Sequence, residues 1–290
     1  MLVVTGANGN LGRRLLKFWE GPARALVRRE SAVDAVRADA PDADIRVLDY
    51  LDEAALTDAL AGADTVVHLV GILKETSNSR YEVAHEKTAG VLIRAAAAAG
   101  ARRLINLSIV GSHLDSDNAC LRSKGTADQL LIDGPVDATV IRVPMVLGEG
   151  DYASGALRAR AHKPVNWLLR AASLEQPLYA GDVVNAVLRM ADDPAFADRI
   201  VELAGPEVLS REALTQRAAR CVGKETRVRS LPLFLGMTAA ALLELLPNPP
   251  VTRAMLGVLD HDDEVDVSGL VAETGLKLTA LDDMLQRCIG

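Results

Sequence analysis

The sequence predicts an α/β protein built on a doubly wound parallel sheet. Short apolar runs of strand length alternate with segments of helical periodicity through the first half of the chain. The first apolar run, residues 2–4, meets a glycine-rich turn and then a helical pattern that begins near Leu11. Hydrophobic residues make up 49% of the 290 residues but aromatic residues only 3%, so alanine, leucine and valine must fill the core.

Six strands are expected, and most of them are separated by helices. The strands occupy residues 2–4, 23–27, 45–48, 64–70, 103–107 and 136–143. The helices follow the glycine-rich turn and cover residues 52–60, 81–99 and 118–132. Because strands that alternate with helices pair in parallel, helices should cover both faces of the sheet.

The alternation weakens from about Gly148, where prolines begin to separate shorter elements. We expect a helix over residues 182–190, a strand near residues 200–203, and a helix over residues 210–221 that Ser210 caps imperfectly. These elements predict a smaller, substrate-facing C-terminal lobe over residues 148–290. This lobe would be interleaved with a nucleotide-binding core of residues 1–147.

Three glycines punctuate the turn after the first strand. In such a turn one glycine permits the sharp bend, the next leaves room for a diphosphate, and the third lets the helix pack closely. The N–H groups at the start of the helix would face the phosphates. The pattern predicts a dinucleotide-binding site. Its predicted contacts in this segment are Thr5, Gly6, Asn8, Gly9, Asn10, Leu11 and Gly12.

The second strand ends at Arg28 and Arg29. In dinucleotide-binding folds an acidic residue at this place binds the ribose 2′-hydroxyl, whereas arginine accommodates a 2′-phosphate. We therefore expect a preference for NADP(H), with NAD(H) as the alternative cofactor. The other interpretation is that both arginines are solvated charges that open a loop.

Further cofactor contacts are expected at the carboxyl ends of the strands, where ligands collect in open α/β sheets. Asp49 could accept a hydrogen bond from the adenine amino group, or it could only form a turn. His68, within the fourth strand, is interpreted as a buried, hydrogen-bonded core residue. The other predicted contacts are Tyr50, Val70, Gly71, Ser108, Lys124, Val143 and Pro144.

Charge and cysteine content exclude several classes of protein. The net charge of −7 argues against a nucleic-acid partner, because phosphate neutralisation needs a basic face. Cys120, Cys221 and Cys288 are odd in number and far apart, which fits neither a disulfide framework nor a metal site. The first strand begins beside Met1, so no signal peptide is expected. We therefore expect a cytoplasmic protein.

The most apolar segment covers residues 231–246, with the sequence LPLFLGMTAAALLELL. It is shorter than the roughly 20 residues that a membrane-spanning helix needs. Pro232, Gly236 and Glu244 also interrupt it. The segment is interpreted as a packed lid helix. The alternative is an exposed apolar face that touches a membrane or a hydrophobic partner.

Several segments resemble the short-chain dehydrogenase/reductase superfamily. They are TGANGNLG at residues 5–12, RALVRR at 24–29, CLRSKG at 120–125, IRVPMVLGEGD at 141–151 and ELAGPEVLS at 202–210. The resemblance is strongest to the atypical, NmrA-like branch that includes the dehydrogenase-like accessory subunit of respiratory complex I. It spans most of the chain and implies a Rossmann sheet that binds NAD(P)(H).

The resemblance also implies catalytic positions. Active members use a serine, a tyrosine and a lysine, and these positions hold Ser108, Cys120 and Lys124 here. The tyrosine-dependent mechanism therefore cannot operate as it stands. A thiol beside a lysine could carry a proton, but a cysteine side chain is far shorter than a tyrosine. Other candidate groups for the same cleft are Tyr81, His85, His113, Tyr152 and Tyr179.

Three functions follow from these observations. The first is an NADP(H)-dependent oxidoreductase whose hydride acceptor, such as a quinone, an imine or an activated alkene, does not need the usual acid. The second is a noncatalytic nucleotide binder that has a structural or redox-sensing role and acts with a protein partner. The third, sugar-nucleotide epimerisation or dehydration, is weaker because such reactions depend on the missing tyrosine.

Overall fold

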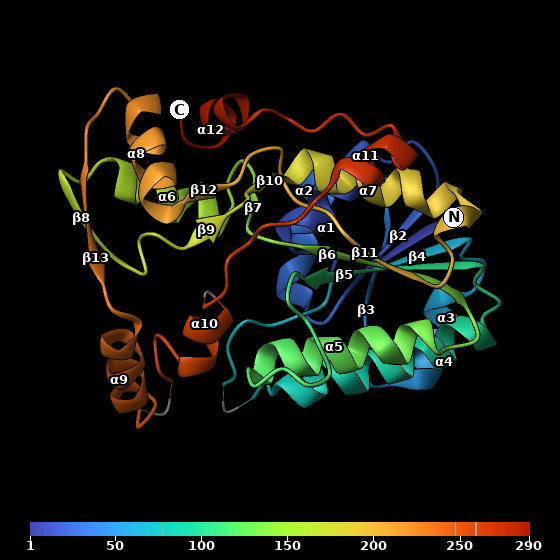
Figure 1. Cartoon of the computed structure of the whole chain (residues 1–290). Coiled ribbons are helices and arrows are strands. Elements are labelled where there is room, and N and C mark those ends of the chain that lie inside the picture. The colour runs from blue at the N-terminus through green and yellow to red at the C-terminus, as the bar shows by residue number, and fades with distance from the viewer. Residues whose placement is uncertain (77, 247, 259) are drawn as a thin grey trace. The chain divides into compact units, whose positions relative to one another are not determined.

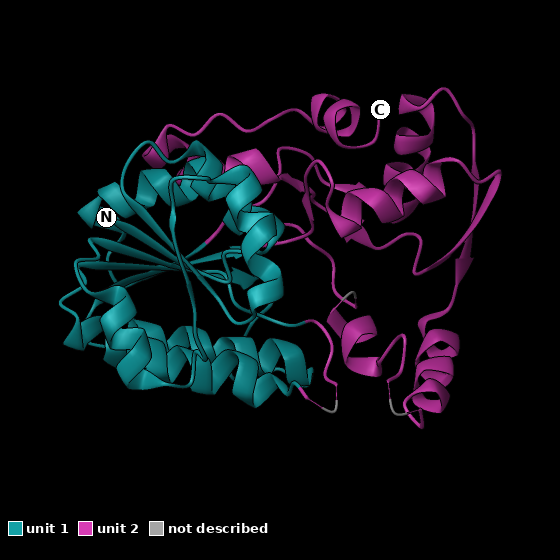
Figure 2. Ribbon diagram, turned by 180° about the vertical axis from the view of Figure 1, so that it is seen from behind, with its two compact units in different colours: residues 1–72, 79–142, 183–201 teal, residues 73–78, 143–182, 202–290 magenta. Residues whose placement is uncertain are grey.

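The computed structural model of the protein describes residues 1–76, 78–246, 248–258 and 260–290 (Figure 1). This part of the chain forms two compact units, which are interleaved in sequence (Figure 2). Unit 1 contains residues 1–72, 79–142 and 183–201, and unit 2 contains residues 73–78, 143–182 and 202–290.

The central sheet has seven strands in the order β11-β6-β5-β4-β1-β2-β3. Strand β1 pairs in parallel with β2 on one side and with β4 on the other, so the strand order reverses beside β1. This arrangement confirms the predicted doubly wound α/β fold. The strands are β1 (Leu2–Thr5), β2 (Ala23–Val27), β3 (Asp44–Val47), β4 (Thr65–His68), β5 (Arg103–Ile109), β6 (Asp137–Val143) and β11 (Arg199–Glu202).

The seventh strand corrects the prediction of a six-stranded sheet. Strand β11, which the sequence assigns to the C-terminal lobe, joins the sheet beside β6. The chain that leads to it is anchored to the sheet by side chains. The Thr139 hydroxyl donates to the carbonyl of Phe196 over 2.6 Å, and the Arg103 guanidinium donates to the carbonyl of Met190 over 2.8 Å. These bonds hold the end of α7 and the chain before β11 against β5 and β6.

Helices cover both faces of the sheet. Helices α3, α4 and α5 lie along one face, and α1, α2 and α7 lie along the other (Figure 1). A π-helical segment, Glu82–Lys87, precedes α4 within the single helix predicted over residues 81–99. The helices are α1 (Asn10–Phe18), α2 (Val33–Asp39), α3 (Glu53–Leu60), α4 (Thr88–Ala98), α5 (Ala119–Ile132) and α7 (Ala180–Asp192).

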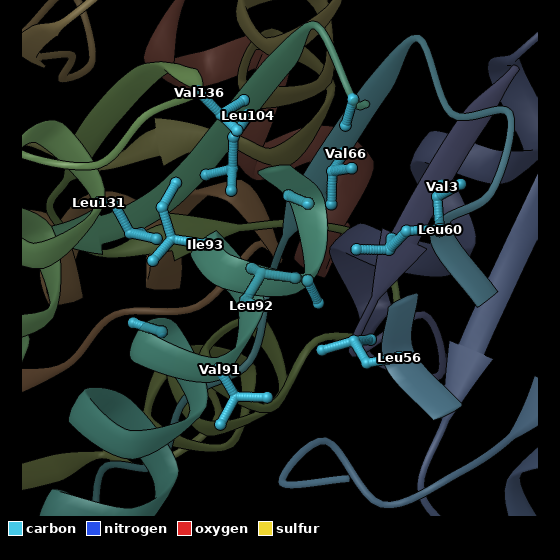
Figure 3. Packing of buried hydrophobic residues seen from close by; sticks show 14 of the residues in the cluster. Val3, Leu56, Leu60, Val66, Val91, Leu92, Ile93, Leu104, Leu131 and Val136 are labelled. Carbon is cyan, nitrogen blue, oxygen red and sulfur yellow. The ribbon is translucent and has the colours of Figure 1, made fainter. Parts of the chain in front are cut away.

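The core of unit 1 is aliphatic, as the composition predicts. Leucine and valine side chains from α3, α4 and α5 interdigitate with those of the strands beneath them (Figure 3). Burying one such side chain contributes about 1.5–3 kcal/mol to folding, so this layer fixes the helices on the sheet. The labelled members include Val3, Leu56, Leu60, Val66, Leu92, Leu104 and Leu131.

Unit 2 contains short strands and six helices among its described residues. The strands pair as β7 (Val146–Leu147) with β10 (Leu178–Tyr179), β9 (Leu174–Glu175) with β12 (Leu209–Ser210), and β8 (Val165–Leu169) with β13 (Arg227–Leu231). The helices are α6 (Tyr152–Ala161), α8 (Arg211–Cys221), α9 (Leu233–Leu243), α10 (Arg253–Val258), α11 (Ser268–Thr274) and α12 (Leu281–Ile289).

Helices α6, α8 and α12 share a second apolar core, which includes Leu157, Leu214 and Met284. The predicted cap of α8 is confirmed, because the Ser210 hydroxyl accepts a hydrogen bond of 3.1 Å from the N–H of Ala213. Throughout the described parts of both units, every helix is too short or too polar to cross a membrane.

Candidate functional site

The turn between β1 and α1 depends on glycine at two positions. Gly6 has a φ of +71°, and a Cβ on it would lie 3.0 Å from the carbonyl carbon of Leu69. A Cβ on Gly12 would lie 2.8 Å from the Cα of Ala7. Gly6 therefore lets the chain bend against the end of β4, and Gly12 lets α1 pack on the turn, as predicted. Between them, Gly9 is exposed and begins α1.

Tyr50 holds this turn in place. Its hydroxyl accepts a hydrogen bond of 2.8 Å from the N–H of Gly6 and donates one of 2.6 Å to the carbonyl of Leu26. The side chain is buried, and burial raises the pKa of its phenol to about 12. Tyr50 is predicted as a cofactor contact, but its hydroxyl serves two main-chain partners. It connects the end of β2 to the glycine turn.

The other predicted cofactor contacts in this part of the sheet lie at the carboxyl ends of its strands. Parallel strands place their carboxyl ends together, and β1, β2, β3 and β4 are parallel. Arg28 and Arg29 are exposed directly after β2. Asp49, after β3, accepts a hydrogen bond of 3.0 Å from the N–H of Leu51, as expected for its turn interpretation. At this edge, Asn8 and Gly71 are exposed, Asn10 and Leu11 are half-buried at the start of α1, and Val70 is buried.

His68 is a core residue, as predicted. Its Nδ1 lies 2.7 Å from the hydroxyl of Thr5, so the two neighbouring strands β1 and β4 are joined by this hydrogen bond. Burial lowers the pKa of His68 to about 3, and the positive charge of Lys124 acts in the same direction. The imidazole is therefore neutral at physiological pH.

Lys124 reaches from α5 to the end of β4. Its amine donates a hydrogen bond of 3.1 Å to the carbonyl of Leu107, and a Cβ on Gly71 would lie 3.1 Å from the Nζ atom. Burial lowers the pKa of the Lys124 amine, whereas the nearby carboxyl of Asp128 raises it. The structure thus brings together two predicted site residues, Lys124 and Gly71, that are far apart in sequence.

A buried carboxylate that the sequence analysis missed organises the other side of this cluster. Asp128 Oδ2 accepts hydrogen bonds of 2.9 Å from the Ser108 hydroxyl and 3.0 Å from Nε of Arg142. Its Oδ1 accepts one of 3.0 Å from the Asn106 amide. Burial raises the pKa of Asp128, and Lys124 opposes this shift. The available sequence signal is the spacing of Asp128 four residues after Lys124, which places both on one face of a helix.

Cys120 and His85 each hydrogen-bond to the main chain of Ile72. The Cys120 thiol is completely buried and donates to the carbonyl of Ile72 over 3.6 Å. The N–H of Ile72 donates to Nε2 of His85 over 3.1 Å. The Asn118 side chain caps α5 by accepting from the N–H of Cys120, which fixes the start of this helix.

The bond from Ile72 settles the protonation state of His85. Because Nε2 is an acceptor, Nδ1 carries the ring proton, and this buried nitrogen lacks a hydrogen-bond partner among the described residues. Burial lowers the pKa of His85 to about 3, so the ring stays neutral. Tyr81 stacks on the ring at a centroid distance of 5.6 Å.

The remaining sequence candidates lie in other surroundings. The His113 side chain is exposed, and its Nδ1 accepts from the N–H of Asp115. Tyr152 is 93% exposed at the start of α6, and the Tyr179 hydroxyl donates to Glu149 over 2.7 Å. Both tyrosines belong to unit 2, as do Val143, which ends β6, and Pro144, which follows it.

Comparison with known families identifies the family of this chain. Residues 6–166, more than half of the chain, match the model of a family described as NAD(P)H-binding. The chain belongs to this NAD(P)H-binding family. The matched residues include the glycine turn from Gly6, strands β2 to β6 and the whole of α5.

Two known proteins resemble the chain over nearly its full length. It is 25% identical to subunit 9 of the NADH dehydrogenase [ubiquinone] 1 alpha subcomplex, a mitochondrial protein of Arabidopsis thaliana, covering 96% of this chain and 73% of that protein. It is 26% identical to the ceramide reductase of Caulobacter vibrioides, covering 94% of this chain and 88% of that protein.

Among solved structures, the NADPH complex of an NADPH-dependent quinone oxidoreductase from Escherichia coli has the same fold. Its TM-score is 0.77 at 20% identity, and the match covers 98% of each chain.

The first prediction concerns the support of the glycine turn. Tyr50→Phe removes the acceptor for Gly6 and the donor to Leu26, so two main-chain groups lose their partner. We expect the free energy of unfolding to fall by about 1–3 kcal/mol, measured by urea denaturation. The matched control is Tyr152→Phe, at an exposed tyrosine, which should change it by less than about 0.5 kcal/mol. Equal effects of the two substitutions would contradict this role.

The second prediction concerns pH. The folded protein holds the pKa of His68 and His85 at about 3, below the ordinary value of 6.5. Between these values the unfolded chain binds more protons than the folded one, so stability falls as the pH drops below 6.5. Each histidine should cost about 2 kcal/mol of stability between pH 7 and pH 5.

Urea denaturation at several pH values tests this expectation. His85→Gln should make the loss of stability with falling pH shallower, because one buried imidazole is removed. The matched control is His162→Gln, which makes the same substitution at an exposed histidine. A His85→Gln protein that keeps the full loss between pH 7 and pH 5 would disprove the assignment.

Proposed function

We propose that this protein is an NADP(H)-preferring oxidoreductase that transfers a hydride to an acceptor needing no proton from a protein phenol. The observation that carries the proposal is the state of Cys120 at the tyrosine position. Its thiol is buried and gives its hydrogen to the carbonyl of Ile72. The chain thus keeps the residues expected to bind the cofactor but lacks the tyrosine that would act as the catalytic acid.

The glycine turn fits a dinucleotide. A side chain at Gly6 or Gly12 would collide with the main chain at Leu69 or Ala7, while Gly9 leaves the start of α1 open. The first N–H groups of a helix bind phosphate, and Gly9 offers no side chain to compete for them. The two exposed arginines after β2 favour the 2′-phosphate of NADP(H) by charge-assisted hydrogen bonds.

Lys124 and Asp128 support the nicotinamide end of the proposed site. Lys124, beside Gly71, is the residue expected to bind the nicotinamide ribose, by resemblance to active members of the superfamily. Asp128 fixes Ser108 and balances the Lys124 charge, so it acts as a positioning residue. The bound cofactor would supply the hydride, and the protein would hold it against the acceptor.

The absence of a catalytic tyrosine limits the class of hydride acceptor. The Cys120 thiol donates its hydrogen to the carbonyl of Ile72, and the Ser108 hydroxyl donates its hydrogen to Asp128. Neither group therefore has a proton to offer a substrate carbonyl. A quinone would suit such a site, because it would need only the hydride that bound NADPH would supply and one proton from water, leaving NADP⁺, the hydroquinone and hydroxide. The likeness of fold to an NADPH-dependent quinone oxidoreductase agrees with this choice.

The second candidate is a noncatalytic nucleotide binder that braces its own fold or reports redox state to a protein partner. The same bonds at Cys120 and Ser108 favour it, because both hydrogens go to protein acceptors. The similarity to a protein named as a subunit of an NADH dehydrogenase complex points in the same direction. Under either function we propose a cytoplasmic location, which agrees with the free cysteines.

Nucleotide titration tests the cofactor preference. The purified protein should bind NADPH at least tenfold more tightly than NADH. Arg28→Ala together with Arg29→Ala should remove most of this difference by weakening NADPH binding, because charge-assisted hydrogen bonds contribute about 1.5–3 kcal/mol each. Arg102→Ala is the control, since Arg102 is exposed at the amino end of β5. Binding of neither nucleotide, or a preference for NADH, would contradict the proposal.

Steady-state oxidation of NADPH with a water-soluble quinone tests catalysis. Lys124→Met should lower kcat/KM by at least tenfold, whereas Lys224→Met, at an exposed lysine, should not change it. Cys120→Ala should keep kcat within about twofold, because the thiol is not the acid. Tight NADPH binding without turnover on quinones, imines or activated alkenes would establish the noncatalytic alternative instead.

A further inference from the structure

Helix α9 of unit 2 lacks the polar face that a surface helix normally has. All its residues are described, and Ala240 is the one that is buried. Phe234 is 66% exposed, Leu242 is 65% exposed, and Leu245 in the following turn is 82% exposed. Water-exposed helix faces usually carry charged residues, which keep the protein soluble. The apolar surface of α9 therefore indicates a contact with something other than water.

The exposed positions of α9 and its last turn form one stripe. At about 100° per residue, positions 234, 235, 238, 239, 242, 245 and 246 fall within an arc of about 140°. The stripe contains phenylalanine, leucine, alanine and one threonine, Thr238, whose hydroxyl donates to the carbonyl of Phe234. The carboxylate of this segment, Glu244, falls outside the arc and pairs with Arg253 over 2.8 Å.

A second exposed face adjoins the stripe. Strands β8 and β13 pair in parallel, with Val165 opposite Arg227 and Trp167 opposite Arg229. Alternate residues of a strand share a face, so these four side chains lie on one face, and all four are exposed. Strand β13 continues through Pro232 into α9 (Figure 1).

Helix α9 packs on the end of this same face. Leu169 continues the series of Val165 and Trp167 along β8, and a Cβ on Gly236 would lie 2.5 Å from Cδ1 of Leu169. The helix that carries the apolar stripe therefore packs against the end of the strand face that carries the tryptophan and the two arginines, and we consider the two together as one surface of unit 2. We call this surface the α9 patch; it consists of Val165, Trp167, Arg227, Arg229, Phe234, Leu235, Thr238, Ala239, Leu242, Leu245 and Leu246.

We propose that the α9 patch docks this protein onto the surface of an anionic lipid bilayer. Each part of the patch fits a different depth of the membrane. Leucine and phenylalanine side chains enter the acyl boundary, tryptophan prefers the headgroup level, and arginine binds lipid phosphates. The eleven-residue helix is about 16 Å long, well short of the hydrocarbon core of about 30 Å, so it lies in the interface.

Charge and shape favour a bilayer over a protein partner. The chain has a net charge of −7, yet the exposed charges on this sheet face are the two arginines, which complement anionic headgroups. A projecting helix with a wide apolar arc would require a matching groove in a protein partner, whereas a bilayer deforms around it. This inference does not depend on the identity of the nucleotide or on turnover.

Vesicle binding by the full-length chain tests the proposal. The chain has two tryptophans, so Trp19→Phe leaves Trp167 as the single tryptophan probe. Vesicles with 30% phosphatidylglycerol in phosphatidylcholine should shift its emission to shorter wavelength and sediment the protein. Pure phosphatidylcholine vesicles should bind it much more weakly, and added salt should weaken binding to the anionic vesicles.

Substitutions in the α9 patch separate the contribution of its apolar side chains to vesicle binding from that of its arginines. Leu242→Glu with Leu245→Glu should weaken vesicle binding more than tenfold. Arg227→Ala and Arg229→Ala should each weaken it about fivefold, since a basic residue near an anionic surface contributes about 1 kcal/mol. The matched control is Leu130→Glu, at an exposed leucine of α5, which should bind vesicles like the unchanged protein.

Four results would overturn the proposal. They are no binding to anionic vesicles, equal binding to neutral vesicles, unchanged binding of the Leu242→Glu and Leu245→Glu protein, and a homodimer in solution that this double substitution dissociates. The last result would show that a second copy of the chain covers the patch. Circular dichroism of each variant confirms that a loss of binding does not come from unfolding.

Discussion

The close approach of Gly6 to the main chain at Leu69 is the constraint on which the turn between β1 and α1 depends. No side chain fits between the two segments, and the positive φ of Gly6 directs the chain from β1 into α1. Tyr50 fixes the same residue from the side of β2 through the Gly6 N–H. Three strand ends are therefore tied to one peptide unit, which gives α1 a defined position relative to the sheet edge.

The residues around α5 depend on two buried ionisable side chains. Lys124 and Asp128 lie on one face of α5, and each moderates the effect of burial on the pKa of the other. Ser108, Asn106 and Arg142 complete the hydrogen bonds of the carboxylate. A fully satisfied network of this kind resists rearrangement, because removing any member leaves a buried polar group without a partner. It also explains why the Ser108 hydroxyl points to protein and not to solvent.

Local patterns in the sequence were sufficient for the fold class, the glycine turn and the core role of His68, because each rests on neighbouring residues. The strand near residues 200–203 was predicted at the right place in the chain but assigned to the C-terminal lobe, since a sequence pattern predicts a strand but not the strand with which it pairs. The partners of Asp128 come from β5 and β6, so only the folded chain reveals them. The π-helical turn before α4 also lacks a sequence signal that periodicity could detect.

The two hydrogen bonds to the main chain of Ile72 have a consequence for the chemistry of the thiols. Cys120 is completely buried and hydrogen-bonded, whereas Cys221 and Cys288 are partly accessible. An alkylating reagent can reach Cys120 only after the start of α5 separates from the chain at Ile72. The rate at which the Cys120 sulfur is alkylated therefore reports how often this segment opens by local unfolding.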